Sequence, residues 1–217
     1  MMYARVWHVL SRLARRRHTS PISAYIEGPK RMEEIKPLLR RAEPVKWLFY
    51  GDSITHGAKH TYGERDYTQL FAERVRFELG RSHDIILNTA ISGNTTWDLL
   101  ASFDWRVAQF QPDVVFLMIG MNDHNRPGII TPEEFGQNLG ELADRVAVWG
   151  GRTVLQTTCP VLPSQPPEQI ARFDCFMDEM RAVAAQRGLP LVDHARYWAD
   201  HADHHYFWMN NPSHPNA

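Results

Sequence analysis

Cysteine is scarce in this sequence, and its scarcity bears on the compartment in which the protein works. The chain holds two cysteines, Cys159 and Cys175, whose spacing fits neither a disulfide framework nor a zinc site. Such usage suits a reducing compartment. We therefore expect a cytoplasmic protein without a disulfide or zinc framework.

The sequence also lacks a long apolar run and a strong net charge. No run approaches the roughly 20 apolar residues that span a bilayer, so stable membrane insertion is not expected. Arg5, His8 and Arg12 interrupt any apolar core that a secretion signal would need. The formal net charge of -1 offers no general attraction to nucleic acid, so nucleic-acid binding is not expected either.

The 217 residues, 43% of them hydrophobic, suffice for one sizeable core, and we expect a single main domain over residues 45–217. Residues 1–44 form a polar lead-in. Within it, apolar residues recur at helical spacing (Tyr3, Val6, Leu10, Leu13) and predict an amphipathic helix. Packing on the domain surface is the simpler role for this helix, and contact with a membrane is the alternative.

Short apolar runs alternate with longer amphipathic segments along the main domain. The runs predict strands at residues 45–50, 84–89, 113–119, 153–158 and 190–192. The segments between them predict helices at residues 66–80, 95–110, 131–149 and 170–188. The runs are mostly apolar on both faces, as parallel strands are when helices cover both sides.

Capping signals support the predicted helices. Thr131, Pro132 and Glu134 have the spacing of an N-cap, a first helical residue and a capping-box partner. Gly80 and Gly188 stand where a helix C-terminus favours glycine.

This alternation of strand and helix predicts an α/β fold, a three-layer α/β/α sandwich around a doubly wound parallel sheet of about five strands. Functional loops of such sheets follow the carboxyl ends of the strands. In this chain those loops are "GDSITHG", "AISGNTT", "GMNDHN" and the segment after "PLVDHA".

The first of these loops places Ser53 directly after a strand, between Gly51 and Gly57. A serine hydroxyl becomes a nucleophile when a base takes its proton and fixed donors receive the charge that develops on the substrate. The two glycines permit a tight turn and close backbone approach. Taken alone, the triplet "GDS" is more typical of an ordinary turn.

The next two loops contain candidate hydrogen-bond donors. Gly93 can present an unobstructed backbone N–H, and Asn122 can present a side-chain amide N–H. Both are donors of the kind that form an oxyanion hole. A turn glycine and a local amide cap are the alternatives.

Four short blocks in this order resemble the SGNH hydrolases, also called GDSL-type esterases and lipases. The blocks are "GDSITHG", "NTAISGN", "GMND" and "NPSHPN", and the resemblance runs from about residue 45 to residue 217. It implies a flavodoxin-like sandwich and an esterase without cofactor or metal. By this resemblance Ser53 is the nucleophile, His214 is the general base, and Gly93, Asn122 and the Ser53 backbone N–H form the oxyanion hole.

His214 is the one histidine of the 11 that fits a block. Residues 193–205 contain four histidines, but their spacing matches no recognised set of metal ligands, and we expect this segment at the surface. His56 and His60 flank the predicted cleft. We expect them to be loop histidines rather than substrate contacts.

Two features depart from the family pattern. The family commonly has an aspartate three residues before the histidine, whereas this chain has Asn211. An amide oxygen can still accept from the histidine but brings no charge, so a backbone carbonyl, Asp200 or Asp203 are alternative partners for His214. The family also commonly continues into a further helix beyond the position of Ala217, so truncation of the domain at its C-terminus is one reading of this ending.

We therefore expect a serine hydrolase that cleaves small-molecule carboxylic esters, with small acyl groups favoured because the loops leave no obvious lid. The main alternative is a catalytically weak module that binds an acylated glycan or lipid. A phosphate- or nucleotide-binding domain is a third reading, and the absence of a glycine-rich phosphate loop counts against it. The sequence gives no indication of the oligomeric state.

Overall fold

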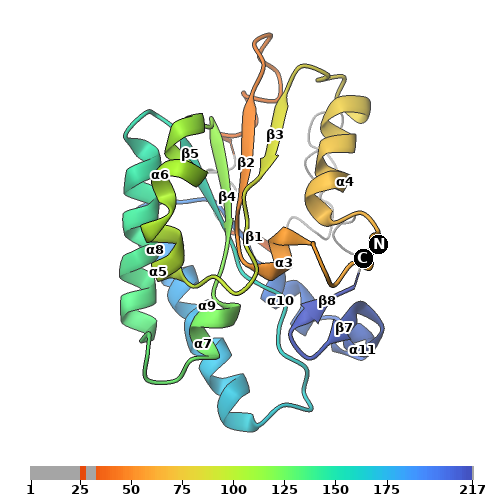
Figure 1. Ribbon diagram of the computed structural model, residues 1–217, viewed down its shortest axis with the longest axis vertical. Helices are drawn as coiled ribbons and strands as arrows, with labels where there is room; N and C mark the ends of the chain where they lie inside the picture. The colour runs from red at the N-terminus through yellow and green to blue at the C-terminus, as the bar shows by residue number, and fades with distance from the viewer. Residues whose placement is uncertain (1–24, 28–32, 217) are drawn as a thin grey trace.

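The computed structural model describes residues 25–27 and 33–216. Over these residues a central sheet carries helices on both faces (Figure 1). The amphipathic helix predicted from Tyr3 to Leu13 lies outside the described residues. Later in the lead-in, Ile35 and Leu38 are buried in the main core. Among the described helices, none is long and apolar enough to cross a membrane.

The main sheet has six strands in the order β1-β6-β5-β4-β2-β3. Their bounds are β1 Ile26–Glu27, β2 Lys46–Gly51, β3 Ile85–Asn88, β4 Val114–Met118, β5 Arg152–Gln156 and β6 Leu191–Val192. Strands β2 to β6 pair in parallel, and β1 is antiparallel to β6. The five parallel strands confirm the predicted doubly wound sheet, and their order is the flavodoxin-like one.

Two β-elements of the fold were not predicted. The edge strand β1 is one, and a separate antiparallel ribbon of β7 (Met209–Asn211) and β8 (His214–Pro215) is the other. Both are very short, and neither has the apolar run that identifies the parallel strands.

Helices and helical turns connect the strands. Their bounds are α3 Ser53–His56, α4 Tyr67–Glu73, a π-helical segment Arg74–Glu78, α5 Thr96–Ala101, α6 Phe103–Arg106, a 3-10 turn Ala108–Phe110, α7 Met121–His124, α8 Pro132–Ala147, α9 Pro167–Arg187, α10 His194–Ala199, a 3-10 turn Ala202–His204 and α11 His205–Trp208. The helices predicted at residues 131–149 and 170–188 correspond to α8 and α9.

The helix predicted at residues 95–110 is wrong as one continuous element. It breaks at Ser102, whose hydroxyl donates to the Asp98 carbonyl oxygen at 2.5 Å and whose backbone leaves the helical region. Serine bonds readily to nearby backbone groups and so competes with a continuing helix. The result is two short helices, α5 and α6, followed by a 3-10 turn.

The predicted cap of α8 is half right. The Thr131 hydroxyl accepts from the Glu134 N–H at 3.1 Å, as an N-cap does. The Glu134 carboxylate, however, accepts from the Trp97 indole N–H at 2.8 Å, across to α5. At the end of α9, Gly188 has φ 74°, so this residue ends the helix as predicted.

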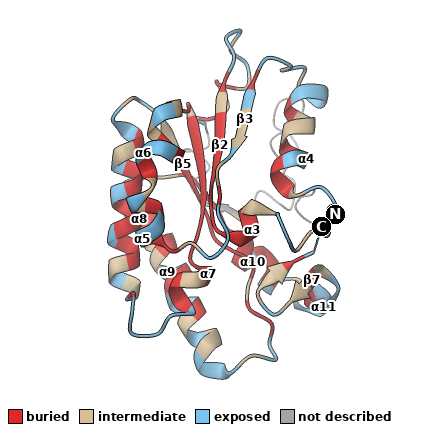
Figure 2. Cartoon of the chain, viewed as in Figure 1, coloured by how far each residue is buried: buried red, intermediate tan, exposed pale blue. Residues whose placement is uncertain are grey.

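Aromatic side chains fill the layer between the sheet and α4. Trp47 and Phe49 of β2 point to this face and pack against Phe71 of α4 and Phe116 of β4, with ring centroids 4.8–6.2 Å apart. On the other face, α5, α8 and α9 pack together and Phe135 contacts Phe176 at 5.1 Å. Figure 2 shows β2 and β5 buried between these two layers, whereas the edge strand β3 is intermediate to exposed. Burial on both sides explains why the central strands are apolar on both faces.

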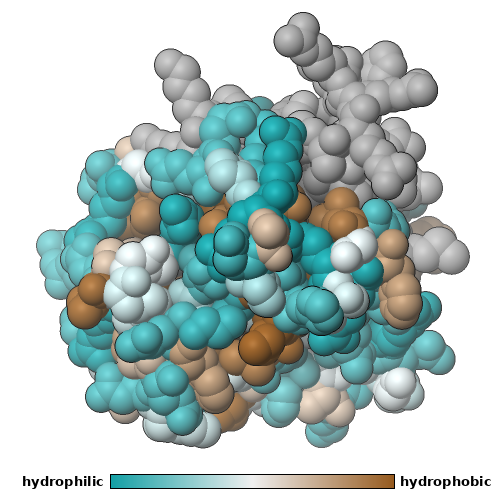
Figure 3. Space-filling view, turned by 90° about the horizontal axis from the view of Figure 1, so that it is seen from above, coloured by the Kyte–Doolittle hydropathy of each residue, from teal (hydrophilic) through white to brown (hydrophobic). Residues whose placement is uncertain are grey.

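Helix α3 lies at the carboxyl ends of the strands, near α7 and the ribbon (Figure 1). The molecule seen from above in Figure 3 is covered mainly by hydrophilic side chains over its described part, with apolar residues scattered between them.

Candidate active site

Ser53 begins α3, directly after β2. The Asp52 carboxylate accepts from the Ile54 N–H at 3.0 Å and starts the helix, and Gly57 ends it with φ 66°. A side chain at Gly51 would collide with the Met118 carbonyl oxygen of β4, so only glycine lets the two strands meet here. These constraints hold Ser53 at the end of the sheet, with 8% of it exposed.

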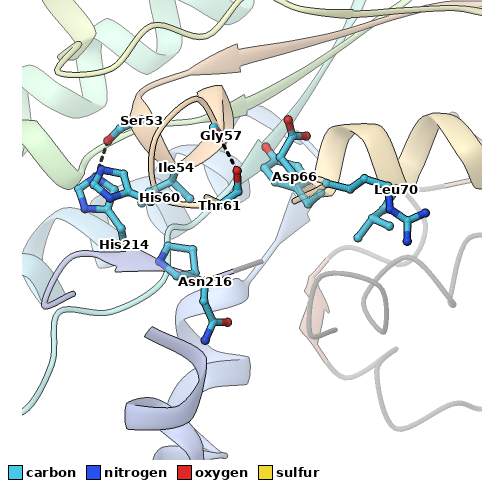
Figure 4. A pocket seen from close by; sticks show the side chains of 12 residues that line it. Ser53, Ile54, Gly57, His60, Thr61, Asp66, Leu70, His214 and Asn216 are labelled. Carbon is cyan, nitrogen blue, oxygen red and sulfur yellow. Dashed lines mark hydrogen bonds between the residues drawn. The ribbon is translucent and has the colours of Figure 1, made fainter. Parts of the chain in front are cut away.

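A chain of hydrogen bonds joins Ser53 to His214 and His214 to Asn211. The Ser53 Oγ lies 2.7 Å from the His214 Nε2 (Figure 4). The His214 Nδ1 lies 3.0 Å from the Asn211 Oδ1. An amide oxygen only accepts, so the Nδ1 carries the proton and the Nε2 is free to accept from the Ser53 hydroxyl. The structure thus brings together three of the five predicted site residues.

Asn211 is the predicted partner whose side chain hydrogen-bonds to the His214 ring. Its Oδ1 also accepts from the backbone N–H of Ser213 at 3.0 Å and of His214 at 3.1 Å. The two alternative side chains have other partners, since Asp200 bonds to the Tyr25 hydroxyl and Asp203 pairs with His204. Of the partners that the sequence left open, the amide is the one in contact.

The surroundings of His214 disfavour its protonated form. Burial, and secondarily the charge that His60 can carry, lower the pKa of His214 to about 4. Among the described residues, no carboxylate hydrogen-bonds to the ring to counter this shift. The imidazole is therefore neutral at physiological pH, the state that can take a proton.

The two predicted donors lie on neighbouring loops of the same sheet end. Gly93, with φ 84°, is in the loop after β3, and Asn122 is in α7. The Asn122 amide donates to the Asn94 carbonyl oxygen at 2.9 Å and so holds the Gly93 loop. The hydrogen-bonded chain from Ser53 to Asn211 does not include either residue.

Arg106 is a further support of this loop that the sequence analysis missed. Its buried guanidinium donates to the Thr89 carbonyl oxygen at 2.8 Å and to the Asn94 side-chain oxygen at 2.6 Å. It also lies over the Tyr50 ring, 4.6 Å from the centroid. No sequence signal distinguishes this arginine from those at the surface, because its partners come from other parts of the chain.

Two buried carboxyl groups adjoin the site. Burial raises the pKa of Asp52 to about 7 and that of Asp123 to about 6, and the charge on Asp123 contributes to the shift of Asp52. Asp123 accepts from the N–H and the hydroxyl of Thr96, at 2.9 and 2.7 Å. Each carboxyl therefore fixes the turn that carries a predicted site residue, Ser53 or Asn122.

The expectation that the histidine cluster lies at the surface is wrong for two of its members. His194 and His205 are 3% and 5% exposed. The His194 Nε2 donates to the Gln156 Oε1 at 3.1 Å, and the His205 Nε2 donates to the Trp198 carbonyl oxygen at 2.6 Å. They begin the short helices α10 and α11 and face the core, a placement that the polar local sequence conceals. Over the described residues, no group of three or more His, Cys, Asp or Glu side chains is arranged to hold a metal ion.

The two loop histidines have different surroundings. The His56 Nδ1 lies 3.1 Å from the Ser92 hydroxyl, next to Gly93. The His60 ring lies flat on the His214 ring, with centroids 3.5 Å apart and planes 21° apart. Sequence reasoning did not identify His60 as a neighbour of His214, because 154 positions separate them and no local pattern links them.

A small pocket opens beside Ser53 and His214. Its cavity volume is about 30 Å³. The lining residues are Ser53, Ile54, Gly57, His60, Thr61, Arg65, Asp66, Tyr67, Leu70, His214, Pro215 and Asn216 (Figure 4).

The chain matches the GDSL-like Lipase/Acylhydrolase family over residues 49–217. It is 37% identical over 86 residues to an acetylxylan esterase of Geobacillus stearothermophilus, a match covering 36% of this chain and 39% of that protein. It is 35% identical over 109 residues to an uncharacterized Mycoplasma pneumoniae protein, covering 49% of this chain but 12% of that protein. The chain thus spans less than half of either relative.

One solved structure covers far more of the chain. LAE5, an alpha/beta hydrolase enzyme from the metagenome of Lake Arreo, is 29% identical with a TM-score of 0.67. The comparison covers 82% of this chain and 90% of that one.

Proposed function

The chain belongs to the GDSL-like Lipase/Acylhydrolase family, and on that premise we propose that it hydrolyses carboxylic esters through an acyl-enzyme on Ser53. The observation that carries this proposal is the continuous hydrogen-bonded chain from the Ser53 Oγ through His214 to Asn211, at 2.7 and 3.0 Å. A nucleophile, a base and a group that orients the base are the parts that nucleophilic catalysis needs.

The acylation step follows from this arrangement. The Ser53 Oγ attacks the ester carbonyl carbon while its proton passes to the neutral His214 Nε2. Asn211 keeps the resulting imidazolium in place by accepting from its Nδ1–H. The imidazolium then gives the proton to the departing alcohol, which leaves the acyl group on Ser53.

The negative charge of the tetrahedral intermediate needs fixed donors. The backbone N–H groups of Gly93 and Ser53 and the side-chain amide of Asn122 are the candidates. One N–H of the Asn122 amide donates to the Asn94 carbonyl oxygen, and this bond sets the direction of the second N–H of the same amide.

Deacylation reverses the roles of the groups. Neutral His214 takes a proton from water, the resulting hydroxide equivalent attacks the acyl carbon, and the imidazolium returns the proton to the Ser53 Oγ as the acid leaves. No cofactor is needed for any of these steps.

The size of the pocket favours a short acyl group. Its cavity volume of about 30 Å³ leaves room for a small group such as an acetyl beside Ser53 and His214. Similarity to an acetylxylan esterase points the same way. We propose acetyl and other short-chain esters as the substrates.

Asn211 supports a second candidate function. A neutral partner stabilises the imidazolium less than a carboxylate does, and the Asp-to-Asn change in the serine-protease triad costs about 10⁴ in turnover. A module that binds an acylated glycan or lipid without turning it over is the alternative, and an inactive protein that still binds such a ligand would favour it.

The test combines covalent labelling with turnover. A fluorophosphonate probe should label Ser53, and Ser53→Ala should abolish both labelling and hydrolysis of p-nitrophenyl acetate while circular dichroism stays unchanged. Ser82→Ala, an exposed serine outside the site, is the matched control and should keep both. An adduct mapped to Ser92 or Ser213 would refute the assignment of the nucleophile. Comparing acetate, butyrate and longer esters tests the preference for short acyl groups.

A further inference from the structure

His60 is held against the catalytic candidates by contacts from three directions. Its ring stacks on His214 at 3.5 Å between centroids. The Asn211 Nδ2 lies 3.3 Å from the His60 Nδ1, and the Asn210 Nδ2 lies 3.4 Å from the same atom. Figure 4 shows the two imidazoles side by side next to Ser53.

These contacts define the protonation state of His60. Amide nitrogens only donate, so both amides approach the His60 Nδ1 as donors and this atom must carry a lone pair. A proton on the Nδ1 would face two donors and lose both contacts. The ring therefore fits its site as the neutral form with its hydrogen on the Nε2.

The charged and titratable groups around His60 agree with a neutral ring. Burial, followed by the charge of neighbouring Lys59, lowers the pKa of His60. Arg65 and Asp66 line the same pocket, with Arg65 paired to Glu73 and Asp66 occupied in capping α4, and His214 covers one ring face.

The Asn211 side chain links His60 to His214. One end of the Asn211 amide donates to His60 and the other accepts from the His214 Nδ1. An acceptor at the nitrogen polarises the amide and strengthens the oxygen as an acceptor. An aspartate would need no such partner, because it has a full charge and two equivalent oxygens.

The stacked ring also acts on His214 directly. During acylation His214 becomes a cation, and a neutral aromatic face attracts a cation that lies against it. A protonated His60 would repel that cation instead. The stack therefore helps only while His60 is neutral.

We propose that neutral His60 is a positioning residue that partly replaces the missing carboxylate, by polarising Asn211 and by stacking on the His214 imidazolium. This inference rests on the proposed function, since it concerns the base of that reaction. His60 lies outside the four sequence blocks that carry the family resemblance.

Two substitutions separate the two contributions. His60→Ala removes the stack and the acceptor, and it should lower kcat by about tenfold with little change in KM. His60→Phe keeps an aromatic face but removes the acceptor, and its loss should be smaller. His83→Ala, an exposed histidine before β3, is the matched control and should retain the parent kcat. Thermal unfolding of each variant checks that it is folded.

The pH profile gives a readout that a purely structural role would not change. Protonation of either His60 or His214 should inactivate the parent enzyme. On the acid side, the slope of log kcat/KM against pH should therefore approach two, as for the uptake of two protons. In His60→Phe only His214 titrates, so this slope should fall to one. An unchanged steepness would contradict the requirement for a neutral His60.

A double-mutant cycle with Asn211→Asp tests the replacement of the carboxylate. If His60 compensates for the missing charge, the kcat lost in His60→Ala should be largely restored in the His60→Ala, Asn211→Asp double variant. This inference would be overturned if His60→Ala lowered kcat equally in the parent and in Asn211→Asp. It would also be overturned if His60→Ala kept the kcat of an active parent. Either result leaves the proposed function intact. A parent that neither hydrolyses esters nor reacts with the fluorophosphonate would overturn both.

Discussion

The Asn211 Oδ1 accepts a hydrogen bond from the His214 Nδ1 at 3.0 Å, so an uncharged amide holds the ring that contacts Ser53. Asn211→Asp places a negative charge at this point. The charge should raise the pKa of His214 from about 4, so the acid limb of kcat/KM should move to higher pH. It should also increase kcat, because it stabilises the imidazolium formed during acylation.

Turnover measured against pH for Asn211→Asp and the parent checks this prediction. Asp200→Asn and Asp203→Asn are matched controls, because neither side chain contacts His214, and both should follow the parent profile. If Asn211→Asp also follows it, the amide does not set the basicity of His214.

Loss of an oxyanion donor should slow acylation without weakening binding. Asn122→Ala should lower kcat by about 10² to 10³ and leave KM nearly unchanged. Asn138→Ala is the control, since this amide donates to the Thr96 hydroxyl at 3.0 Å and supports the same region from α8. The control should lose stability while keeping kcat. Near-normal turnover in Asn122→Ala would reduce Asn122 to a support for the Gly93 loop.

Asp52 makes the free energy of unfolding depend on pH. Its pKa is raised from 3.8 to about 7, so over this interval the folded protein keeps a proton that the unfolded chain has released. The stability contributed by the protonated carboxyl is therefore lost as pH rises toward 7. Asp52→Asn does not titrate, so its stability relative to the parent should increase with pH by at most about 1.4 kcal/mol per unit.

Urea unfolding at several pH values between 4 and 8 measures this difference. Asp104→Asn, at an exposed carboxylate in α6, is the control, and its stability should run parallel to that of the parent. A constant difference between Asp52→Asn and the parent would show that Asp52 is ionised throughout.

The two cysteines should differ in reactivity. Cys159 is buried and burial raises the pKa of its thiol, whereas Cys175 is exposed on α9. Iodoacetamide should modify one thiol in the folded protein and two in denaturant, as counted by mass spectrometry. Cys175→Ser should abolish modification of the folded state. Modification of Cys159 under native conditions would indicate that this part of the core opens.

The main sheet could be predicted because its signal is local. Parallel strands covered on both faces appear as short apolar runs, and each predicted strand lies within about two residues of the observed one. The family resemblance could also be found from the sequence, because each block is contiguous, and the match over residues 49–217 confirms it.

The missed features depend on contacts between distant residues. His60 is identified by its stack on His214, and Arg106 by its bonds to Thr89 and Asn94. The polar segment around His194 and His205 concealed two buried rings, which hydrogen-bond to Gln156, 38 positions away, and to the nearby Trp198 carbonyl oxygen. The roles of Ser53, Gly93, Asn122, Asn211 and His214 stay predictions until the variants are assayed.

The ribbon that carries His214 has a consequence for how the protein loses activity on heating. β7 and β8 pair with each other rather than with the main sheet, and the bonds to the rest of the fold include Leu162 N–H to Pro212 carbonyl oxygen at 3.0 Å. Other bonds are made by side chains, to Ser53, to His60 and to Tyr62, and not by a strand ladder. A unit outside the strand ladder can detach at a lower free energy than global unfolding requires. Esterase activity should therefore disappear several degrees below the main calorimetric transition, with far-UV circular dichroism still native, so that inactivation would report the detachment of the base rather than the melting of the sheet.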